Sequence, residues 1–327
     1  MEGERLRLAA YASHHEAKWN GFVRASKNGT FLLERGFMDY HADRFPDCSL
    51  MAFHGDDDRD LAAVLPAARI AHDGSHWLAS HPGLTYGGWV TDGRMTTAVM
   101  LRLFELMEVW AMAAGLDGVR YKATPRCYHR LPADEDLHAL FAAHARLVRQ
   151  DVTSVIDIAA APTWAKGRQH ALSKARKSGV SVEVSDDYDD FHDCLSEALA
   201  RHGAKPVHSL AELKLLADRF PQQIRLYASR FEGEAIAYVW VFDCGQTVHT
   251  QYMAARPTGR ELGGLDAIIG RLQFEDYADR RYLSFGISTT GDGTTLNRGL
   301  IAQKEMFGGR AMVCPVFDLS VTTGGRA

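Results

Sequence analysis

Apolar and polar residues follow the same succession of strand and helix periods twice along the chain. Apart from a helical start over the first 46 residues, where Ser13-His14-His15-Glu16 has the form of a capping box, period-two and period-3.6 runs define the elements. In the first half the pattern predicts strands at 49–54, 61–71 and 76–80, a helix at 95–114, a strand at 118–122, a helix at 134–144 and a strand at 146–158. In the second half it predicts strands at 224–231, 235–242 and 247–254, a helix at 262–278, a strand at 282–286, a helix at 295–307 and a strand at 311–319.

From the long helix onward the corresponding elements lie roughly 162–166 positions apart, so we interpret the chain as a duplicated unit. Two unrelated α/β units that happen to alternate are the alternative, because such alternation is common. Between the halves, 162–179 predicts a helix and 180–184 a strand. A further helix at 187–202 precedes one that opens with a second capping box, Ser209–Glu212. We therefore expect an α/β (α+β) protein with domains at 1–158 and 159–327, each a mixed, largely antiparallel sheet flanked by helices.

The composition is that of an ordinary globular protein long enough for two domains: 327 residues, 46% hydrophobic and 24% charged. A formal net charge of −4 argues against nucleic-acid binding over most of the surface, so an anionic partner needs a local patch. The five cysteines form no CxxC pair, and no histidine spacing suits a metal, so we expect neither a disulfide framework nor a metal site.

The chain start has no apolar stretch of the kind a signal peptide needs. The longest apolar stretch, 95–114, carries Arg102, Glu105 and Glu108 at helical spacing, which indicates an amphipathic helix rather than a membrane span. We expect a cytoplasmic protein.

Several stretches carry a resemblance to a known family. They are the basic passage 173–182, the loop His81–Gly88, and the ending Tyr282–Gly286 with Gly299–Gly309, where a strand and a glycine lead to a helix with a lysine before an aromatic residue and glycine. Together with the element order, they resemble GNAT-superfamily acyltransferases of the tandem FemAB/FemX type. The resemblance implies two GNAT-like domains and transfer of an acyl or aminoacyl group to an amine. The donor would be acetyl-CoA or another acyl-CoA, or alternatively aminoacyl-tRNA, and the acceptor an amino sugar, a cell-wall precursor or a peptide.

One loop departs from that family. Acetyl-CoA enzymes of the fold carry Arg/Gln-x-x-Gly-x-Gly/Ala, whose amides at a helix start hold the pyrophosphate. Here residues 256–265 read RPTGRELGGL. The motif is not matched whether it is aligned to start at Arg256 or at Arg260, and Glu261 lies where the pyrophosphate would bind. The candidate donor-binding residues in this loop are Arg256, Arg260, Gly263 and Gly264.

Candidate catalytic residues follow from the needs of acyl transfer: a proton must be moved and an oxyanion stabilised. By resemblance, Lys304 is a cation that stabilises the acyl carbonyl or a phosphate. His249 is a candidate base and Tyr252 a proton donor, and period two places them on opposite faces of their strand. Asp292 lies in a loop, where a carboxylate can orient an amine. The structural alternatives are a surface lysine, half-buried strand residues and a turn residue.

A basic run in 166–177 contains no acidic residue, which suits phosphate contacts with a tRNA as well as an ordinary solvated helix face. Its candidate donor-binding residues are Lys174, Arg176 and Lys177. The candidate acceptor-binding residues are His81, Tyr86, Gln251, Asn297 and Arg298.

The leading hypothesis is therefore an N-acyltransferase that acts by direct attack of the amine, since the sequence has no GxSxG motif and no evident Cys–His pair. A non-catalytic binding protein on a duplicated fold is the alternative from a different class.

Overall fold

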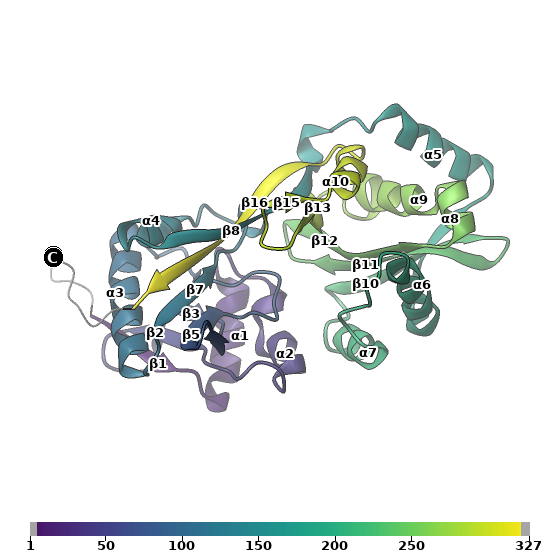
Figure 1. Cartoon of the computed structure of the whole chain (residues 1–327). Helices are drawn as coiled ribbons and strands as arrows, with labels where there is room; N and C mark the ends of the chain where they lie inside the picture. Colours follow the sequence, from purple (N-terminus) through teal and green to yellow (C-terminus); the bar gives the residue numbers. More distant parts are fainter. Residues whose placement is uncertain (1–4, 322–327) are drawn as a thin grey trace. The chain divides into compact units, whose positions relative to one another are not determined.

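The computed structural model describes residues 5–321, which form two compact units (Figure 1). Within the described residues, unit 1 contains the chain up to Asp151, Asp292–Thr294 and the chain from Val313 onward. Unit 2 contains Val152–Gly291 and Thr295–Met312. The two units are described separately below.

Unit 1 has two sheets. The first, in the order β1-β2-β3-β6, is antiparallel and consists of Leu6–Ala10, Leu50–His54, Asp60–Leu65 and Val90–Thr91. The second, in the order β4-β5-β7-β16, consists of Ala67–His72, Ser75–Ser80, Gly118–Lys122 and Arg310–Ser320. In the second sheet only β5 and β7 run parallel.

The helices of unit 1 are α1 (Glu16–Ala25), α2 (Arg35–Met38), α3 (Thr97–Ala113) and α4 (Glu135–Ala142). Helix α3 begins where the Thr96 hydroxyl accepts a hydrogen bond from the amide of Val99. Its buried side chains Met100, Leu103, Phe104 and Met107 pack in the core of the unit with residues from the strands. This core accounts for the apolar stretch at 95–114, and no helix of residues 5–321 is long and apolar enough to cross a membrane.

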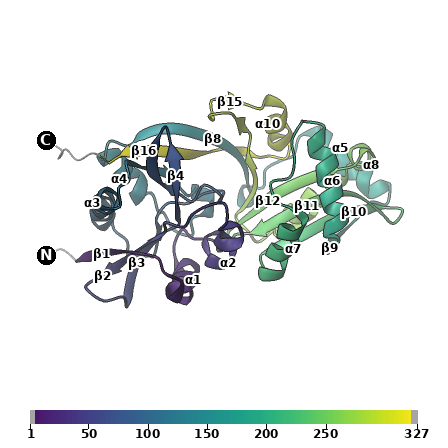
Figure 2. The same cartoon turned by 60° about the horizontal axis from the view of Figure 1, so that its bottom comes forward.

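Unit 2 is one sheet in the order β8-β13-β12-β11-β10-β9, with helices on both faces (Figures 1 and 2). Its strands are Arg146–Asp157, Tyr282–Ile287, Thr247–Ala255, Glu234–Asp243, Ile224–Phe231 and Ser181–Ser185. One face carries α5 (Lys166–Lys177), α8 (Pro257–Leu262) and α9 (Gly264–Arg271), and the other carries α6 (Tyr188–Ala200) and α7 (Leu210–Arg219). A short hairpin, β14 (Thr289–Thr290) with β15 (Thr295–Leu296), precedes α10 (Arg298–Glu305).

The predicted fold class is confirmed, and the predicted spacing agrees with the elements. Strand β7 begins at Gly118 and β13 at Tyr282, 164 positions later, while β8 begins at Arg146 and β16 at Arg310, again 164 positions later. The last strands are exchanged, however: β8 pairs with β13 in unit 2, and β16 pairs with β7 in unit 1. The compact units therefore differ from the expected domains 1–158 and 159–327. Two strands with similar patterns at similar spacings do not reveal which unit each one joins, so the sequence pattern could not predict the exchange.

Four local predictions were wrong. The first 46 residues include β1, and the predicted capping box at Ser13 is a 3₁₀ turn without a side-chain cap, whereas the one at Ser209 is present. The run 61–71 is two strands in different sheets, because Pro66 lacks the N–H that a continuous ladder needs. The helix expected at 295–307 starts only at Arg298, after β15.

Candidate active site in unit 2

The parallel strands β12 and β13 of unit 2 pair over three residues and then separate. Thr247–His249 pairs with Tyr282–Ser284, after which β12 continues to Ala255 along β11 alone. Within residues 5–321, no strand pairs with that edge of β12 beyond His249. An unpaired strand edge presents backbone N–H groups, which are the donors that a developing oxyanion requires.

A buried polar cluster lies where the two strands separate. The Ser284 hydroxyl is 3.3 Å from His249 Nδ1 and 3.5 Å from the Thr153 hydroxyl of β8, and Thr250 Oγ1 donates to the Ser284 carbonyl at 3.2 Å. Burial and the nearby Lys304 charge lower the pKa of His249 to about 4. The imidazole is therefore neutral at pH 7 and able to accept a proton.

Lys304 of α10 fixes the segment that follows β13. Its ammonium donates to the carbonyls of Gly286 (2.9 Å) and Ile287 (2.8 Å) and to the Ser288 hydroxyl (2.9 Å). These contacts use all three N–H donors, so the geometry suits a positioning role better than direct contact with a carbonyl or phosphate. Burial lowers the pKa of Lys304 to about 8, which leaves it mostly charged at pH 7.

Gly286 lies between the lysine and the histidine. Its φ of +69° is in the left-handed region, and a Cβ at this position would lie 3.2 Å from His249 Cε1. Glycine therefore lets the chain turn closely against the imidazole.

The predicted faces of β12 were wrong because the strand contains a β-bulge. His249 pairs with Phe242 and Thr250 with Val241, but Tyr252 pairs with Trp240, so Gln251 is an extra residue. Because cross-strand partners share a face, the bulge places Tyr252 on the same face as His249.

Tyr252 is half-buried and its hydroxyl lies 2.8 Å from His208 Nδ1. The ring stacks on Trp240 with a centroid separation of 5.9 Å. Burial raises the pKa of Tyr252, so the hydroxyl stays protonated at neutral pH and can donate a proton.

The glycine loop before α9 is packed against its neighbours. A Cβ at Gly263 would lie 2.6 Å from the carbonyl oxygen of Ala171 in α5, and one at Gly264 would lie 2.7 Å from the Ser229 hydroxyl. The first turn of α9 also contains the buried Asp266, whose carboxylate pairs with Arg168 of α5 at 3.2 Å. A protein carboxylate thus lies in the first turn of the helix at whose start a pyrophosphate would be expected, and its charge disfavours a second anion there.

The arginines of this loop bind the protein itself. Arg256 forms a two-pronged ion pair with Asp190 of α6 at 2.6 and 2.9 Å, and Arg260 donates to the Ala255 carbonyl at 2.8 Å. In α5, Lys174 donates to the Glu261 carbonyl at 2.9 Å. Arg176 and Lys177 are exposed, and neither has an ion pair within the described part of the chain.

The remaining predicted residues of the second half lie outside the polar cluster. Asp292 is exposed in the β14–β15 turn and accepts hydrogen bonds from the amide and hydroxyl of Thr294. Asn297 is the N-cap of α10, accepting from the amide of Leu300 at 3.0 Å, and Arg298 beside it is exposed. Gln251, at the bulge, is half-buried and close to the cluster.

The two predicted residues of unit 1 are buried. The Tyr86 hydroxyl bonds to Thr30 Oγ1 at 2.7 Å, and its ring lies 4.4 Å from that of Tyr128. The ring of His81 lies 5.1 Å from that of His41. Both side chains therefore belong to the interior of unit 1.

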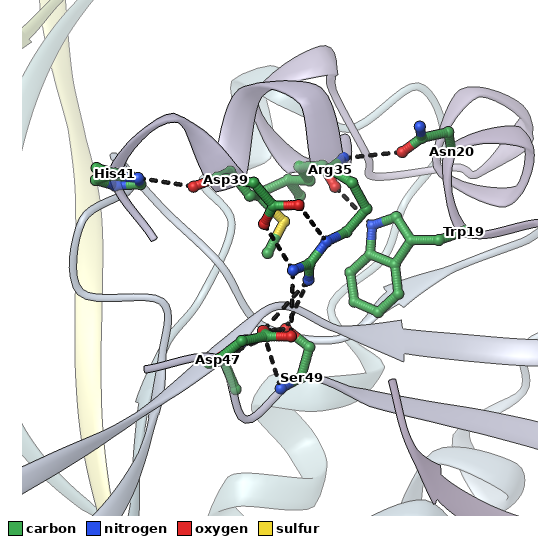
Figure 3. Close-up of polar contacts among 10 residues, drawn as sticks. Trp19, Asn20, Arg35, Asp39, His41, Asp47 and Ser49 are labelled. Carbon is green, nitrogen blue, oxygen red and sulfur yellow. Dashed lines mark hydrogen bonds and ion pairs between the residues drawn. The ribbon is translucent and has the colours of Figure 1, made fainter. Parts of the chain in front are cut away.

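Sequence reasoning missed a charge network in unit 1, centred on the buried Arg35 (Figure 3). Its guanidinium donates to Asp39 and Asp47 at 2.6 and 3.1 Å and lies 4.0 Å above the Tyr11 ring. No spacing rule links these positions, because they meet only in the folded unit. Since the guanidinium is paired on both sides, the network is structural.

The comparisons agree with this geometry. Residues 165–290 match the family model described as "Acetyltransferase (GNAT) domain", and no curated protein gave a match. The crystal structure of FemX covers 96% of this chain and 97% of its own, with a TM-score of 0.70 and 11% identity. A conserved protein of unknown function from Bacteroides thetaiotaomicron VPI-5482 (TM-score 0.59, 10% identity) covers 97% of this chain and 100% of its own. L-PGS from Bacillus licheniformis (TM-score 0.57, 12% identity) covers 92% and 90%.

Residues 165–290 therefore match the GNAT acetyltransferase domain, and the fold of the chain is that of FemX, the tandem architecture that the sequence motifs predict. The family match falls on unit 2, the unit that contains the separating strands and the His249–Ser284 cluster.

Sequence reasoning did not single out Ser284, Thr153 or His208. Ser284 lies within the family motif Tyr282–Gly286, and this motif is the sequence feature that could have identified it. Thr153 and His208 reach the site through strand exchange and tertiary packing, and neither carries a local signal.

Proposed function

We propose that the protein is an N-acyltransferase whose chemistry takes place where β12 and β13 separate. The observation that supports it most is the conjunction of an unpaired β12 edge, a neutral buried His249 and a protonated Tyr252 on one face of the sheet. The edge supplies backbone donors, and the side chains supply an acceptor and a donor of protons.

In the proposed reaction the amine nitrogen of the acceptor attacks the acyl carbonyl carbon directly. A C–N bond forms, and the thioester C–S bond or the aminoacyl ester C–O bond breaks, with the electron pair leaving on sulfur or oxygen. His249, held by Ser284, takes the proton that the amine loses. Tyr252 gives a proton to the leaving group and recovers one through His208. Lys304 keeps residues 286–288 in place beside these groups.

The donor is acyl-CoA or aminoacyl-tRNA, and the packing favours aminoacyl-tRNA. The Asp266 carboxylate in the first turn of α9, paired with Arg168, disfavours a CoA pyrophosphate there. The exposed cations of α5, including Arg176 and Lys177, would instead meet phosphates of a tRNA. For acyl-CoA, Arg256, Arg260, Gly263 and Gly264 would have to release their present partners.

The proposed acceptor is a small-molecule or peptide amine in the cytoplasm. Gln251 lies beside the cluster in unit 2. The other candidates for contacts with the acceptor are Asn297 and Arg298 of unit 2 and His81 and Tyr86 of unit 1. Asp292, engaged with Thr294, would orient the amine only after that turn opens.

The test is a transfer assay on the intact protein. Acetyl-CoA and tRNA charged with a labelled amino acid are each incubated with a panel of amino sugars, peptides and cell-wall precursors, and products are identified by mass spectrometry. Formation of an N-acylated product that is lost in Ser284→Ala supports the proposal. Binding of a donor without any product, across the whole panel, favours the non-catalytic alternative.

A further inference from the structure

The β-bulge in β12 of unit 2 places Gln251 beside the two side chains to which the proposed proton transfers are assigned. Gln251 opposes no residue of β11, and the pairing of β12 with β13 ends two positions earlier, at His249. Its side chain is half-buried. A bulge next to an active site can re-aim a side chain. Here the re-aimed group is a carboxamide in contact with both His249 and Tyr252, which share a face of the sheet.

The Gln251 carboxamide meets these two neighbours with opposite polarity. Burial lowers the pKa of His249, and the hydrogen bond with Gln251 opposes that fall, which identifies the amide oxygen as the acceptor of a ring N–H. Burial raises the pKa of Tyr252, and the hydrogen bond with Gln251 opposes that rise, which identifies the amide NH₂ group as the donor to the hydroxyl oxygen. Because an amide carries its acceptor and its donors on opposite sides, one orientation of the side chain satisfies both contacts.

The other polar groups that face this pair come from different elements. On the imidazole side, the Ser284 hydroxyl of β13 lies 3.3 Å from Nδ1, and the charge of Lys304 in α10 acts on the ring. On the phenol side, His208 Nδ1 lies 2.8 Å from the hydroxyl, and the charge of Glu212 in α7 acts on it. Gln251 contacts both sides, so it links two groups whose other partners are on separate parts of unit 2.

We propose that Gln251 is a positioning residue that couples the base and the acid of the acyl transfer, an inference that rests on the proposed function. In that reaction the amine proton passes to His249 and the Tyr252 proton passes to the leaving group, so an imidazolium and a phenolate form together. The amide oxygen then faces the new positive charge and the NH₂ group faces the new negative charge. A dipole already oriented in this way stabilises both charges without rearranging, and no covalent bond to Gln251 forms or breaks.

The first experiment tests the contact without donor or turnover, so its result is separate from that of the acyltransferase proposal. Ring ¹⁵N signals of the histidines are followed by NMR between pH 5 and pH 8, and His249→Gln assigns the His249 signal. A carboxylate in contact with an imidazole raises its pKa. His249, with a pKa of about 4, should therefore gain a titration midpoint above pH 5 in Gln251→Glu and in neither Gln251→Met nor the exposed control Gln222→Glu. An unchanged His249 signal in Gln251→Glu would overturn the proposal.

The second experiment separates positioning from binding of the acceptor, in the transfer assay. Gln251→Met should lower kcat roughly tenfold, since hydrogen bonds to two developing charges are lost, and leave the KM for the acceptor within about twofold. The lost acceptor lowers the pKa of His249 and the lost donor raises that of Tyr252, so both limbs of the pH–rate profile should move outward. Gln222→Met should match the wild type.

Two outcomes of the assay have distinct meanings. A raised KM with unchanged kcat and an unchanged pH–rate profile would make Gln251 an acceptor contact and overturn the positioning role. A protein that forms no product with any acceptor, yet shows the expected NMR titration in Gln251→Glu, would contradict the acyltransferase function and confirm the contact between Gln251 and His249.

Discussion

Each unit has one pair of parallel strands that separates after three paired residues, and the two units treat the opening differently. In unit 1, β5 pairs with β7 from Trp77–Ala79 to Gly118–Arg120, and the loop 81–88 then folds back. The Gly87 amide donates to the Lys122 carbonyl at 3.0 Å, and the Ser80 hydroxyl accepts from the Lys122 amide at 2.6 Å. In unit 2 the opening holds His249 and Ser284, and the Gly286 carbonyl at the end of β13, the strand that corresponds to β7, accepts from the Lys304 ammonium.

This difference suits a protein in which unit 1 contributes stability and unit 2 carries the proposed catalytic site. The Gly87 amide and the Ser80 hydroxyl close the opening in unit 1 through their hydrogen bonds to Lys122, so we expect this opening to serve stability rather than acyl transfer. In unit 2 the Lys304 ammonium binds the Gly286 and Ile287 carbonyls, and this keeps the segment after β13 in place beside the opening. We therefore expect substitutions in unit 2 to change turnover and equivalent ones in unit 1 to change stability.

The largest expected effect follows from Lys304→Ala. Its loss leaves the Gly286 and Ile287 carbonyls without their donor and lets the segment after β13 move, so we expect turnover to fall about 100-fold and thermal stability to drop as well. Steady-state kinetics and a thermal melt measure the two effects, with exposed Lys205→Ala as the matched control. Turnover within twofold of the wild type would remove Lys304 from the mechanism.

The next effect concerns acid sensitivity. His249 has a pKa of about 4 in the folded state against an ordinary value of 6.5, so between these pH values the unfolded state binds more protons and stability falls as the pH falls. At pH 4 the loss from this residue is about 3 kcal/mol. His81 in unit 1 shows the same shift, to about 4. Urea unfolding at pH 7 and pH 4.5 should give a smaller difference in His249→Gln, and the smallest in the double variant with His81→Gln. An unchanged pH dependence in the double variant would contradict both assignments.

A smaller effect is expected at Gly88 in the loop that closes unit 1. Its φ is +82°, and a Cβ would lie 2.8 Å from the Tyr121 hydroxyl, which itself donates to Asp136. Gly88→Ala should cost about 2 kcal/mol of stability, since the left-handed conformation alone costs 1–2. Denaturant unfolding checks the loss, and the mutant should keep its turnover at temperatures where it is folded. A loss of turnover in the folded mutant would show that the loop serves catalysis.

The smallest effect is expected for Ser80→Ala, which removes the acceptor for the Lys122 amide. We expect a loss of about 1 kcal/mol of stability and unchanged transfer activity. Ser284→Ala in unit 2 is the matched comparison, since it should lose activity with a similar change in stability. Equal loss of activity in the two variants would contradict the assignment of catalysis to unit 2 and of stability to the opening in unit 1.

The element order, the duplication and the GNAT resemblance were readable from sequence because they depend on local periodicity and spacing. The bulge at Gln251 was not, because one extra residue in a strand leaves no trace in an alternating pattern and reverses the face of Tyr252. The contacts of Lys304 were also hidden, since its neighbours in sequence do not reveal that it reaches the carbonyls after β13. Strand exchange between β8 and β16 likewise depends on tertiary pairing.

Amide hydrogen exchange with and without donor tests most directly whether the acyl donor binds at the opening in unit 2. The protein is compared alone, with acetyl-CoA, and with tRNA charged with an amino acid, and peptides from both openings are followed by mass spectrometry. The expected result is donor-dependent protection of residues 250–255 and 286–288, with none in residues 81–88. Protection of 81–88 and 118–124, without change at 250–255, would contradict the assignment of the chemistry to unit 2.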